Sequence, residues 1–225
     1  MKKLIKGIVD FREKSIEEYR RKFAKLSLEQ KPDALMIACC DSRVVPNVFA
    51  SSDPGDLFVL RNLGNLIVPY QASYTKDISS ASVVEFSLTN LEVSDIIVCG
   101  HSECGAMYKL LEQGETKYNH ALQPMLNEWL KNAFPSYQRF VDDGFIGAEV
   151  GLAPHNRLSR INVLQQMDNL KTYPLVQERL KNNTLGIHGW WFDLATADVY
   201  YYNHTRSKFI VINEDEAKNM LLGSG

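Results

Sequence analysis

The sequence has few cysteines, no long apolar run and no excess of charge of either sign. Four cysteines in 225 residues are too few for a disulfide scaffold, so Cys clustered with His points to metal binding in a reducing compartment. No stretch approaches the ~18 uninterrupted apolar residues of a membrane span. Lysine and arginine number 25 against 27 aspartates and glutamates, and no segment gathers enough basic residues to hold a nucleic acid. We therefore expect neither a membrane nor a nucleic-acid partner.

The N-terminal segment also lacks the apolar core of a signal peptide, because charged residues interrupt residues 1–12 throughout. We expect a cytoplasmic protein. The chain contains no internal repeat and no low-complexity tract. Its length suits one sizeable hydrophobic core, so we expect a single domain over residues 1–225.

Apolar residues recur at near-helical spacing from Lys2 to about Leu28, among many charged residues. This pattern predicts one or two helices, which end before Pro32-Asp33. Two interpretations remain open for residues 1–30. They form an arm that lies on a partner subunit, or they pack on their own domain.

Short apolar runs predict four buried strands, over residues 34–38, 57–60, 95–99 and 185–192. Helical patterns separate or follow them, over residues 44–50, 78–90, 101–111, 156–169 and 174–181. Such alternation indicates a largely parallel sheet. Residues 199–202 and 209–212 have the pattern of edge strands. The predicted fold class is α/β, with a mostly parallel sheet of four central strands plus an antiparallel edge strand, flanked by helices, and an N-terminal helical arm.

The stretch Cys39-Cys40-Asp41-Ser42-Arg43 lies where the first buried strand leaves the sheet. Strand ends of this kind carry the chemistry of α/β folds. Taken alone, the stretch is ambiguous, because the thiols could be small buried side chains and the two charges could form a local ion pair.

A second stretch, Cys99-Gly-His-Ser-Glu-Cys104, also follows an apolar run. Two strand ends therefore carry ligands that suit zinc. Since neighbours on an extended segment point to opposite sides, we do not expect Cys39 and Cys40 to share an ion. We expect His101 and Cys104 in the first turn of a helix, at positions i and i+3 on one face. Cys40 and Cys99 are interpreted as packed thiols.

His101, Cys104 and one further thiolate make three protein ligands. Three ligands leave a fourth position for water, which distinguishes catalytic zinc from structural zinc. The same ligand set occurs in alcohol dehydrogenases, but the nucleotide-binding pattern G-x-G-x-x-G is missing. Gly100–Gly105 has the glycine spacing of a phosphate-binding loop without the Lys-Ser/Thr that follows it.

Three motifs together resemble the β-class carbonic anhydrases: Cys39-x-Asp41-Ser42-Arg43, Arg61-Asn62-x-x-Asn65 and His101-x-x-Cys104. The resemblance extends from about Leu4 to Tyr202 and includes Asn169-Leu-Lys-Thr-Tyr-Pro174 and His188-Gly-Trp190. It implies reversible hydration of carbon dioxide to bicarbonate and a proton, by a zinc-bound hydroxide that an Asp-Arg pair orients.

The resemblance also implies the roles of particular residues. One zinc ion per subunit is expected on Cys39, His101 and Cys104, and the catalytic pair is expected to be Asp41 and Arg43. The implied substrate-pocket positions are Gln30, Phe58, Leu63, Phe86 and Gly105. Gln30 is expected to enter the pocket of a neighbouring subunit, because the family forms homodimers, often paired into homotetramers. Phe86 stands where the family often has tyrosine.

One departure from the family concerns regulation. Some bacterial members bind inhibitory bicarbonate beside a tryptophan and a tyrosine at positions that here hold Met36 and Phe192, although Arg61 matches the third member of that site. We therefore expect no such inhibition. His188 is interpreted as a hydrogen-bonded histidine on a buried strand, with a proton relay as the alternative. His155 lies in polar, loop-like sequence and receives no role.

Two other functions remain open. The same zinc site could hydrolyse a sulfur analogue such as CS2 or COS, which the motifs do not separate from CO2 hydration. A zinc-stabilised scaffold without turnover is the other alternative. Asp41 and Arg43 argue against the scaffold, because a structural metal needs no orienting carboxylate.

Overall fold

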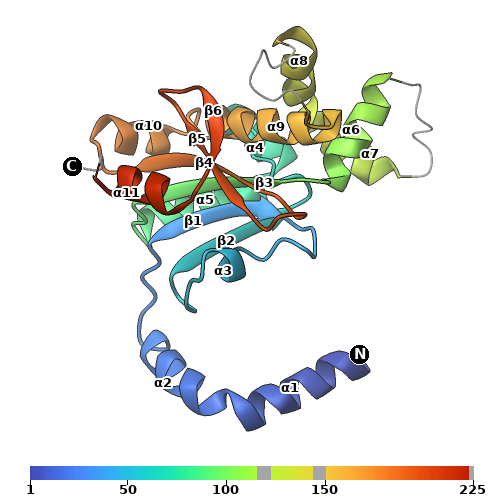
Figure 1. Ribbon diagram of the computed structural model, residues 1–225. Helices are drawn as coiled ribbons and strands as arrows, with labels where there is room; N and C mark the ends of the chain where they lie inside the picture. Colours follow the sequence, from blue (N-terminus) through green and yellow to red (C-terminus); the bar gives the residue numbers. More distant parts are fainter. Residues whose placement is uncertain (116–122, 144–150, 223–225) are drawn as a thin grey trace.

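The structure, a computed structural model, describes residues 1–115, 123–143 and 151–222. Its centre is a six-stranded sheet in the order β2-β1-β3-β4-β5-β6 (Figure 1). The strands are β1 (Ala34–Cys39), β2 (Leu57–Asn62), β3 (Asp95–His101), β4 (Gly186–Phe192), β5 (Val199–Asn203) and β6 (Lys208–Val211).

The first four strands are parallel, which confirms the predicted α/β fold. β1 lies between β2 and β3, with Ala38 paired to Arg61 on one side and to Cys99 on the other. Two antiparallel strands, rather than one, complete the sheet. The reason is a hairpin, in which Asn203 of β5 pairs with Lys208 of β6.

Helices precede, connect and follow the strands. They are α1 (Lys2–Lys14), α2 (Ile16–Leu26), α3 (Pro46–Phe49), α4 (Tyr70–Lys76), α5 (Ile78–Thr89), α6 (Gly105–Glu115), α7 (Pro124–Leu130), a 3-10 turn (Lys131–Ala133), α8 (Phe134–Asp143), α9 (Pro154–Leu170), α10 (Pro174–Lys181) and α11 (Glu214–Leu222). The sequence patterns gave no ranges for α4, α7, α8 and α11. Of these, α4 and α11 are short, and their apolar residues do not form a clear helical stripe.

The two faces of the sheet are buried differently. On one face, Leu35 and Ile37 of β1 pack with apolar side chains of α5, α9 and α10. On the other face, Met36 lies in a smaller cluster to which α3 contributes Phe49, whose ring stacks on Phe192 at 4.7 Å. Residues 35 and 37 face the helices while 36 faces the other side, as the alternation of side chains along a strand requires. Cys39 continues the helix-covered side.

The first two helices form an arm that extends away from the sheet (Figure 1). Neither α1 nor α2 contains a buried residue. The arm is attached near its C-terminal end, where Lys22 Nζ lies 2.7 Å from Asp53 Oδ1 and Leu26 packs on Gly55. Of the two sequence interpretations, packing on the arm's own domain is therefore limited to this C-terminal end, and contact with a partner subunit stays a prediction.

In the part of the chain that the structure describes, no helix combines the length and the apolar character needed to cross a membrane. The cytoplasmic location stays a prediction.

Candidate metal centre

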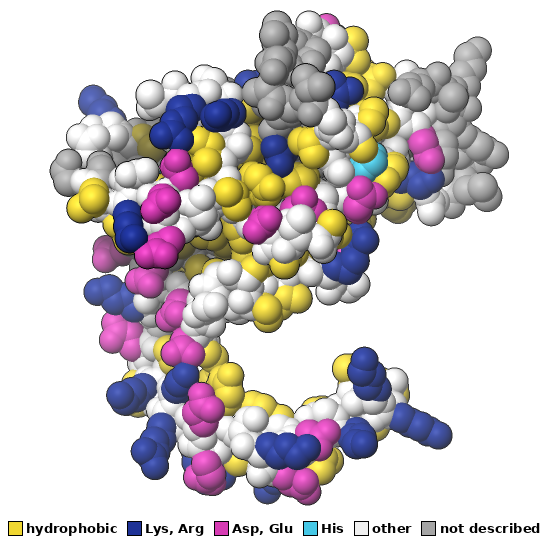
Figure 2. All heavy atoms as spheres, viewed as in Figure 1, with side chains coloured by type: hydrophobic (Ala, Val, Ile, Leu, Met, Phe, Trp, Pro, Cys, Tyr) yellow, Lys and Arg dark blue, Asp and Glu magenta, His cyan; other side chains and the backbone are white. Residues whose placement is uncertain are grey.

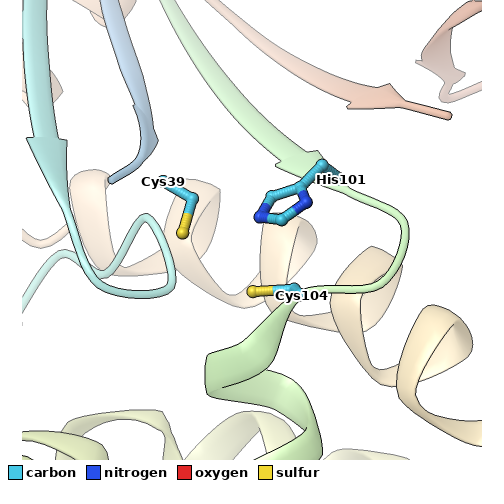
Figure 3. Close-up of side chains that lie close together, drawn as sticks. All are labelled: Cys39, His101 and Cys104. Atoms are coloured by element: carbon cyan, nitrogen blue, oxygen red, sulfur yellow. The ribbon is translucent and has the colours of Figure 1, made fainter. Parts of the chain in front are cut away.

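Three predicted ligands converge at the carboxyl ends of the central strands. The ligand atoms of Cys39, His101 and Cys104 all lie within 4.8 Å of one another. Figure 3 shows both sulfur atoms and the imidazole ring directed toward a common point. The three residues are 3%, 0% and 1% exposed, so the cluster is shielded from bulk water.

The sheet brings the ligands together. Cys39 ends β1 and His101 ends β3, and parallel neighbours end at the same edge of a sheet. His101 does not begin a helix, contrary to the sequence prediction, because pairing with β4 continues to His101 and Phe192. The chain then turns at Glu103, which has a left-handed φ of 56°, and Cys104 precedes α6. The turn, rather than a helix face, directs both side chains to one place.

The hydrogen bonds of His101 leave one ring nitrogen available. Nδ1 lies 2.8 Å from the carbonyl oxygen of Ser102. Since a carbonyl only accepts, Nδ1 carries the proton and the Nε2 lone pair is free. Nε2 is buried and has no hydrogen-bond partner among the described residues. A buried ring nitrogen without a partner, beside two thiols, fits a metal ligand oriented through its other nitrogen.

The two thiols share one proton. A hydrogen bond from Cys104 holds the pKa of Cys39 well below its usual value, against the effect of burial, with smaller contributions from His101 and the Gly64 amide. The same hydrogen bond and burial raise the pKa of Cys104 well above its usual value. Because Cys39 ionises while Cys104 keeps its proton, the site presents a preformed thiolate to a cation.

The loop after β2 supports Cys39. The amide of Gly64 donates to Cys39 Sγ at 3.4 Å. Asn162 on α9 donates to the Gly64 carbonyl at 2.9 Å, and Arg61 donates to the Cys39 carbonyl at 2.9 and 3.0 Å. Hydrogen bonds from a helix and a neighbouring strand thus fix the first ligand.

Asp41 and Arg43 lie beside the cluster as a bidentate pair. Arg43 Nε donates to Asp41 Oδ1 at 2.9 Å and Nη2 donates to Oδ2 at 2.7 Å. The amide of Arg43 donates to Oδ1 as well, at 3.0 Å. The Arg43 side chain is the main cause that holds the pKa of Asp41 well below its usual value, so the carboxylate is ionised at neutral pH.

A cavity of about 210 Å³ opens on these groups. Its lining is more apolar than polar and consists of Cys39, Cys40, Asp41, Leu63, Gly105, Ala106, Lys109 and Leu126. A Cβ added at Gly105 would meet no atom within 4 Å. Two of the predicted pocket residues, Leu63 and Gly105, therefore line a cavity beside the candidate metal site.

The other predicted pocket residues lie elsewhere in a single chain. Phe58 on β2 and Phe86 on α5 contact each other, with ring centroids 5.9 Å apart. Gln30 is exposed at the end of the arm. None of the three lines the cavity beside Asp41 among the described residues.

Comparison with known proteins identifies the family. Residues 34–199 match the family described as carbonic anhydrase. A carbonic anhydrase from Helicobacter pylori (strain J99) is 35% identical over 211 residues, which cover 92% of this chain and 93% of the relative. The solved β-carbonic anhydrase CcaA superposes with a TM-score of 0.83 at 35% identity, covering 94% of this chain and 98% of that one. The chain belongs to the β-class carbonic anhydrases.

A second relative supports this assignment. The Synechocystis carbonic anhydrase is 37% identical over 215 residues, which cover 93% of this chain and 74% of the relative. The prediction that the chain is an enzyme is confirmed by its family.

The remaining cysteines of this β-carbonic anhydrase lie outside the ligand cluster. Cys99 is buried, as expected for a packed thiol, but Cys40 is exposed and its interpretation as a packed thiol is wrong, because it follows the last residue of β1 and points away from buried Cys39. Burial raises the pKa of Cys99 to about 12, so it stays a neutral thiol at physiological pH.

His188 hydrogen-bonds to Asp95 at 2.7 Å, but its side chain is half-exposed rather than buried. Asp95 begins the strand that His101 ends, so this pair lies toward the opposite end of the sheet.

Three residues occupy the positions that form the inhibitory bicarbonate site in some bacterial family members. Here they pack in the core or contact the main chain. Met36 and Phe192 are buried in one cluster. Arg61 donates to the carbonyl oxygens of Cys39, Asp41 and Val44. The absence of bicarbonate inhibition stays a prediction.

Sequence reasoning missed a polar network beside the candidate metal ligands of this carbonic anhydrase. His155 lies on α9, only 8% exposed, and not in a loop. Its Nε2 donates to Glu103 Oε1 at 2.9 Å, and the Tyr108 hydroxyl donates to Oε2 at 2.7 Å. These two bonds, His155 first, lower the pKa of Glu103 to about 2. The position of Glu103 between two ligands was a possible signal, but its partner His155 is 52 residues away.

Proposed function

We propose that this β-carbonic anhydrase interconverts carbon dioxide and bicarbonate with one zinc ion per chain, held by Cys39, His101 and Cys104. The buried Nε2 of His101 carries the proposal, since it lacks a described partner and lies beside two sulfurs that share a proton. Two sulfurs and one nitrogen are ligands that zinc accepts. When bound by three protein ligands, zinc supplies a hydroxide nucleophile near neutral pH by lowering the pKa of water.

Asp41 orients the nucleophile. As an ionised carboxylate it only accepts hydrogen bonds, and Arg43 holds both of its oxygens. The carboxylate therefore accepts a hydrogen bond from a hydroxyl group beside it, which keeps its own proton, and directs the oxygen lone pair away from itself, toward the cavity. Arg43 also prevents Asp41 from taking up a proton near neutral pH, since it disfavours the neutral acid.

The cavity accommodates a small apolar substrate. Leu63, Ala106 and Leu126 give it apolar walls next to Asp41. Carbon dioxide has no charge and needs no ion-pairing group, so such walls suit it. Positioning of this kind converts a bimolecular attack into one between groups already in place.

We further propose that a second copy of the chain completes the pocket, as the family resemblance implies. Among the described residues β2 is an edge strand, so its outer side offers a surface to another chain. The arm carries exposed apolar residues, and Figure 2 shows hydrophobic side chains on the side of the arm that faces the rest of the chain. Gln30, Phe58 and Phe86 would then act in the partner's pocket rather than in their own.

The test is an assay of zinc-replete protein for CO2 hydration by stopped-flow pH change, with CS2 and COS hydrolysis measured on the same sample. We expect hydration of CO2 to exceed hydrolysis of both sulfur compounds in kcat/KM. Hydrolysis of CS2 or COS without CO2 hydration would replace this proposal. Turnover of none of the three, at one zinc per chain, would favour a structural metal.

A further inference from the structure

We propose that Glu103 is a positioning residue, whose side chain holds the loop between His101 and Cys104 so that its own main-chain carbonyl keeps Arg43 against Asp41. This inference rests on the proposed function, in which Arg43 and Asp41 orient the nucleophile. It assigns a role to a residue that belongs neither to the ligands nor to the catalytic pair.

The main chain of Glu103 is in direct contact with Arg43. Arg43 Nη2 donates to the Glu103 carbonyl oxygen at 3.0 Å, in addition to its bond with Asp41 Oδ2. Within the described residues, the Arg43 guanidinium hydrogen-bonds to Asp41 and to this carbonyl only. The Arg43 side chain is 53% exposed, so little packing restrains it. The loop carbonyl is therefore the second of two anchors for the guanidinium.

The backbone of Glu103 adopts a conformation that must be held. Its φ of 56° lies in the left-handed region, which a side chain with a Cβ rarely occupies unless its surroundings fix it. Asn156 on α9 supplies one restraint, because its Oδ1 accepts the Glu103 amide at 2.8 Å. This bond fixes the peptide group on the N-terminal side of Glu103. The Glu103 carbonyl, which accepts the hydrogen bond from Arg43, belongs to the next peptide group.

The carboxylate of Glu103 supplies the remaining restraints. Oε1 accepts hydrogen bonds from His155 Nε2 at 2.9 Å and from Asn156 Nδ2 at 3.1 Å. Oε2 accepts the Tyr108 hydroxyl at 2.7 Å. The Tyr108 and His155 rings stack with centroids 3.8 Å apart, so the two donors hold each other in place. The network joins the loop to α6 through Tyr108 and to α9 through His155 and Asn156.

A glycine at this position would tolerate the same backbone angle without any side-chain anchor. Glutamate stands here instead, and three donors hydrogen-bond to its carboxylate. Its side chain therefore makes the loop rigid and does not merely allow the turn. If the anchor is lost, the carbonyl moves and Arg43 keeps only its bonds to Asp41. A displacement of about 1 Å near reacting groups can cost ~100-fold in rate.

The variants Glu103→Gly and Glu103→Gln separate the effect of the backbone angle from the effect of the hydrogen bonds that the carboxylate accepts. Glu103→Gly keeps the backbone angle and removes the carboxylate, whereas Glu103→Gln keeps the shape and an accepting oxygen. Asp168→Asn is the matched control, because Asp168 is a half-exposed carboxylate on α9 that pairs with Lys171. All variants are prepared with zinc and tested for metal content before use.

The first readout is the exchange with water of the Arg43 Nη2 protons, one of which reaches the Glu103 carbonyl, followed by nitrogen-15 NMR and assigned through Arg43→Lys. We expect exchange in Glu103→Gly to be at least ~10-fold faster than in the wild type, with one zinc retained, and Glu103→Gln to lie within ~3-fold of the wild type. The second readout is kcat/KM for CO2, which should fall at least ~10-fold in Glu103→Gly, mainly through kcat, and recover in Glu103→Gln.

Unchanged Arg43 exchange in a zinc-loaded Glu103→Gly protein would overturn the proposal. Loss of zinc in both Glu103 variants would also overturn it, because the residue would then support the ligand loop and not Arg43. If Glu103→Gly fails to fold, Tyr108→Phe provides the same test, since it deletes one anchoring bond and keeps the ring; no effect on exchange there would count against the proposal. A wild-type protein without CO2 hydration would refute the proposed function, while the exchange measurement would still report on the positioning of Arg43.

Discussion

Arg43 binds Asp41 through two parallel hydrogen bonds, 2.9 Å from Nε to Oδ1 and 2.7 Å from Nη2 to Oδ2. The two residues are separated by a single position in the chain, so the pair is local in sequence, while the Glu103 carbonyl adds a long-range contact to Arg43. Such a fork fixes both the position and the plane of the carboxylate. The pair therefore determines which way Asp41 can direct a neighbouring hydroxyl group.

Removing the two hydrogen bonds from Arg43 should leave the Asp41 side chain free to move. We expect Arg43→Ala to lower kcat/KM for CO2 by about 100-fold or more, because a freed carboxylate turns toward the metal position and competes for the open site. Arg43→Lys keeps the charge but loses the bidentate geometry, so it should recover only part of the activity. Zinc content should stay at one per chain in both. Full activity in Arg43→Ala would contradict the role assigned to the pair.

The two adjacent cysteines allow a matched test of metal binding. Cys39 is buried in the ligand cluster, whereas Cys40 is exposed, so Cys39→Ser should abolish stoichiometric zinc and Cys40→Ser should retain it. Elemental analysis of the purified variants measures zinc per chain directly. Zinc retained in Cys39→Ser would show that a different set of ligands holds the ion.

The shared proton of the two thiols predicts the proton balance of metal binding. The pKa of Cys39 is lowered, so in the metal-free protein at pH 8 it is already a thiolate; the pKa of Cys104 is raised, so it is still a thiol. Because zinc binds both as thiolates and His101 as a neutral ring, uptake should release about one proton per ion. Calorimetric titration in buffers of different ionisation enthalpy gives this number. A release of two protons would mean that Cys39 is protonated in the metal-free site.

Activity should rise toward alkaline pH. Two thiolates place more negative charge on the metal than imidazoles do, so the ionisation that produces the nucleophile should lie above the value of about 7 known for three histidine ligands. Asp41 and Arg43 do not titrate in this range, since the pKa of Asp41 is lowered and that of Arg43 is raised. Measurement of kcat/KM from about pH 6.5 to 9.5 tests this expectation. A flat profile would contradict it.

The exposed apolar side chains of the arm predict its contribution to self-association. Ile5 and Ile8 are 54% and 68% exposed in the single chain. Burying an aliphatic side chain contributes about 1.5 kcal/mol or more, so the double variant Ile5→Asp and Ile8→Asp should weaken self-association by about 100-fold.

Sedimentation velocity over a concentration series measures this change. Lys14→Ala is the control, because Lys14 forms an exposed ion pair with Asp10 within the same helix. Association unchanged in the double variant would exclude the arm from the subunit contact.

The sequence predicted the strands and the long helices well, because their signals are local. The apolar runs that became β1, β3 and β4 alternate with helical patterns, and α9 and α10 were anticipated within a few residues. The helix that was predicted to begin at His101 begins instead at Gly105. Strand pairing with β4 extends β3 to His101, and the hydrogen bonds of a neighbouring strand are invisible to a local pattern.

Residue types and short spacings narrowed the candidate ligands to His101, Cys104 and one further thiol, and the family resemblance implied Cys39 and the Asp41-Arg43 pair. The tertiary structure decided which distant residues they contact. The sheet order places Cys39 beside His101 although 62 positions separate them in sequence, and α9 brings His155 to Glu103. Tertiary structure also decided that the arm leaves its own domain, since an amphipathic pattern reports an apolar face but not the surface that covers it. Contacts between distant residues depend on how strands and helices pack, and no spacing along the chain records that packing.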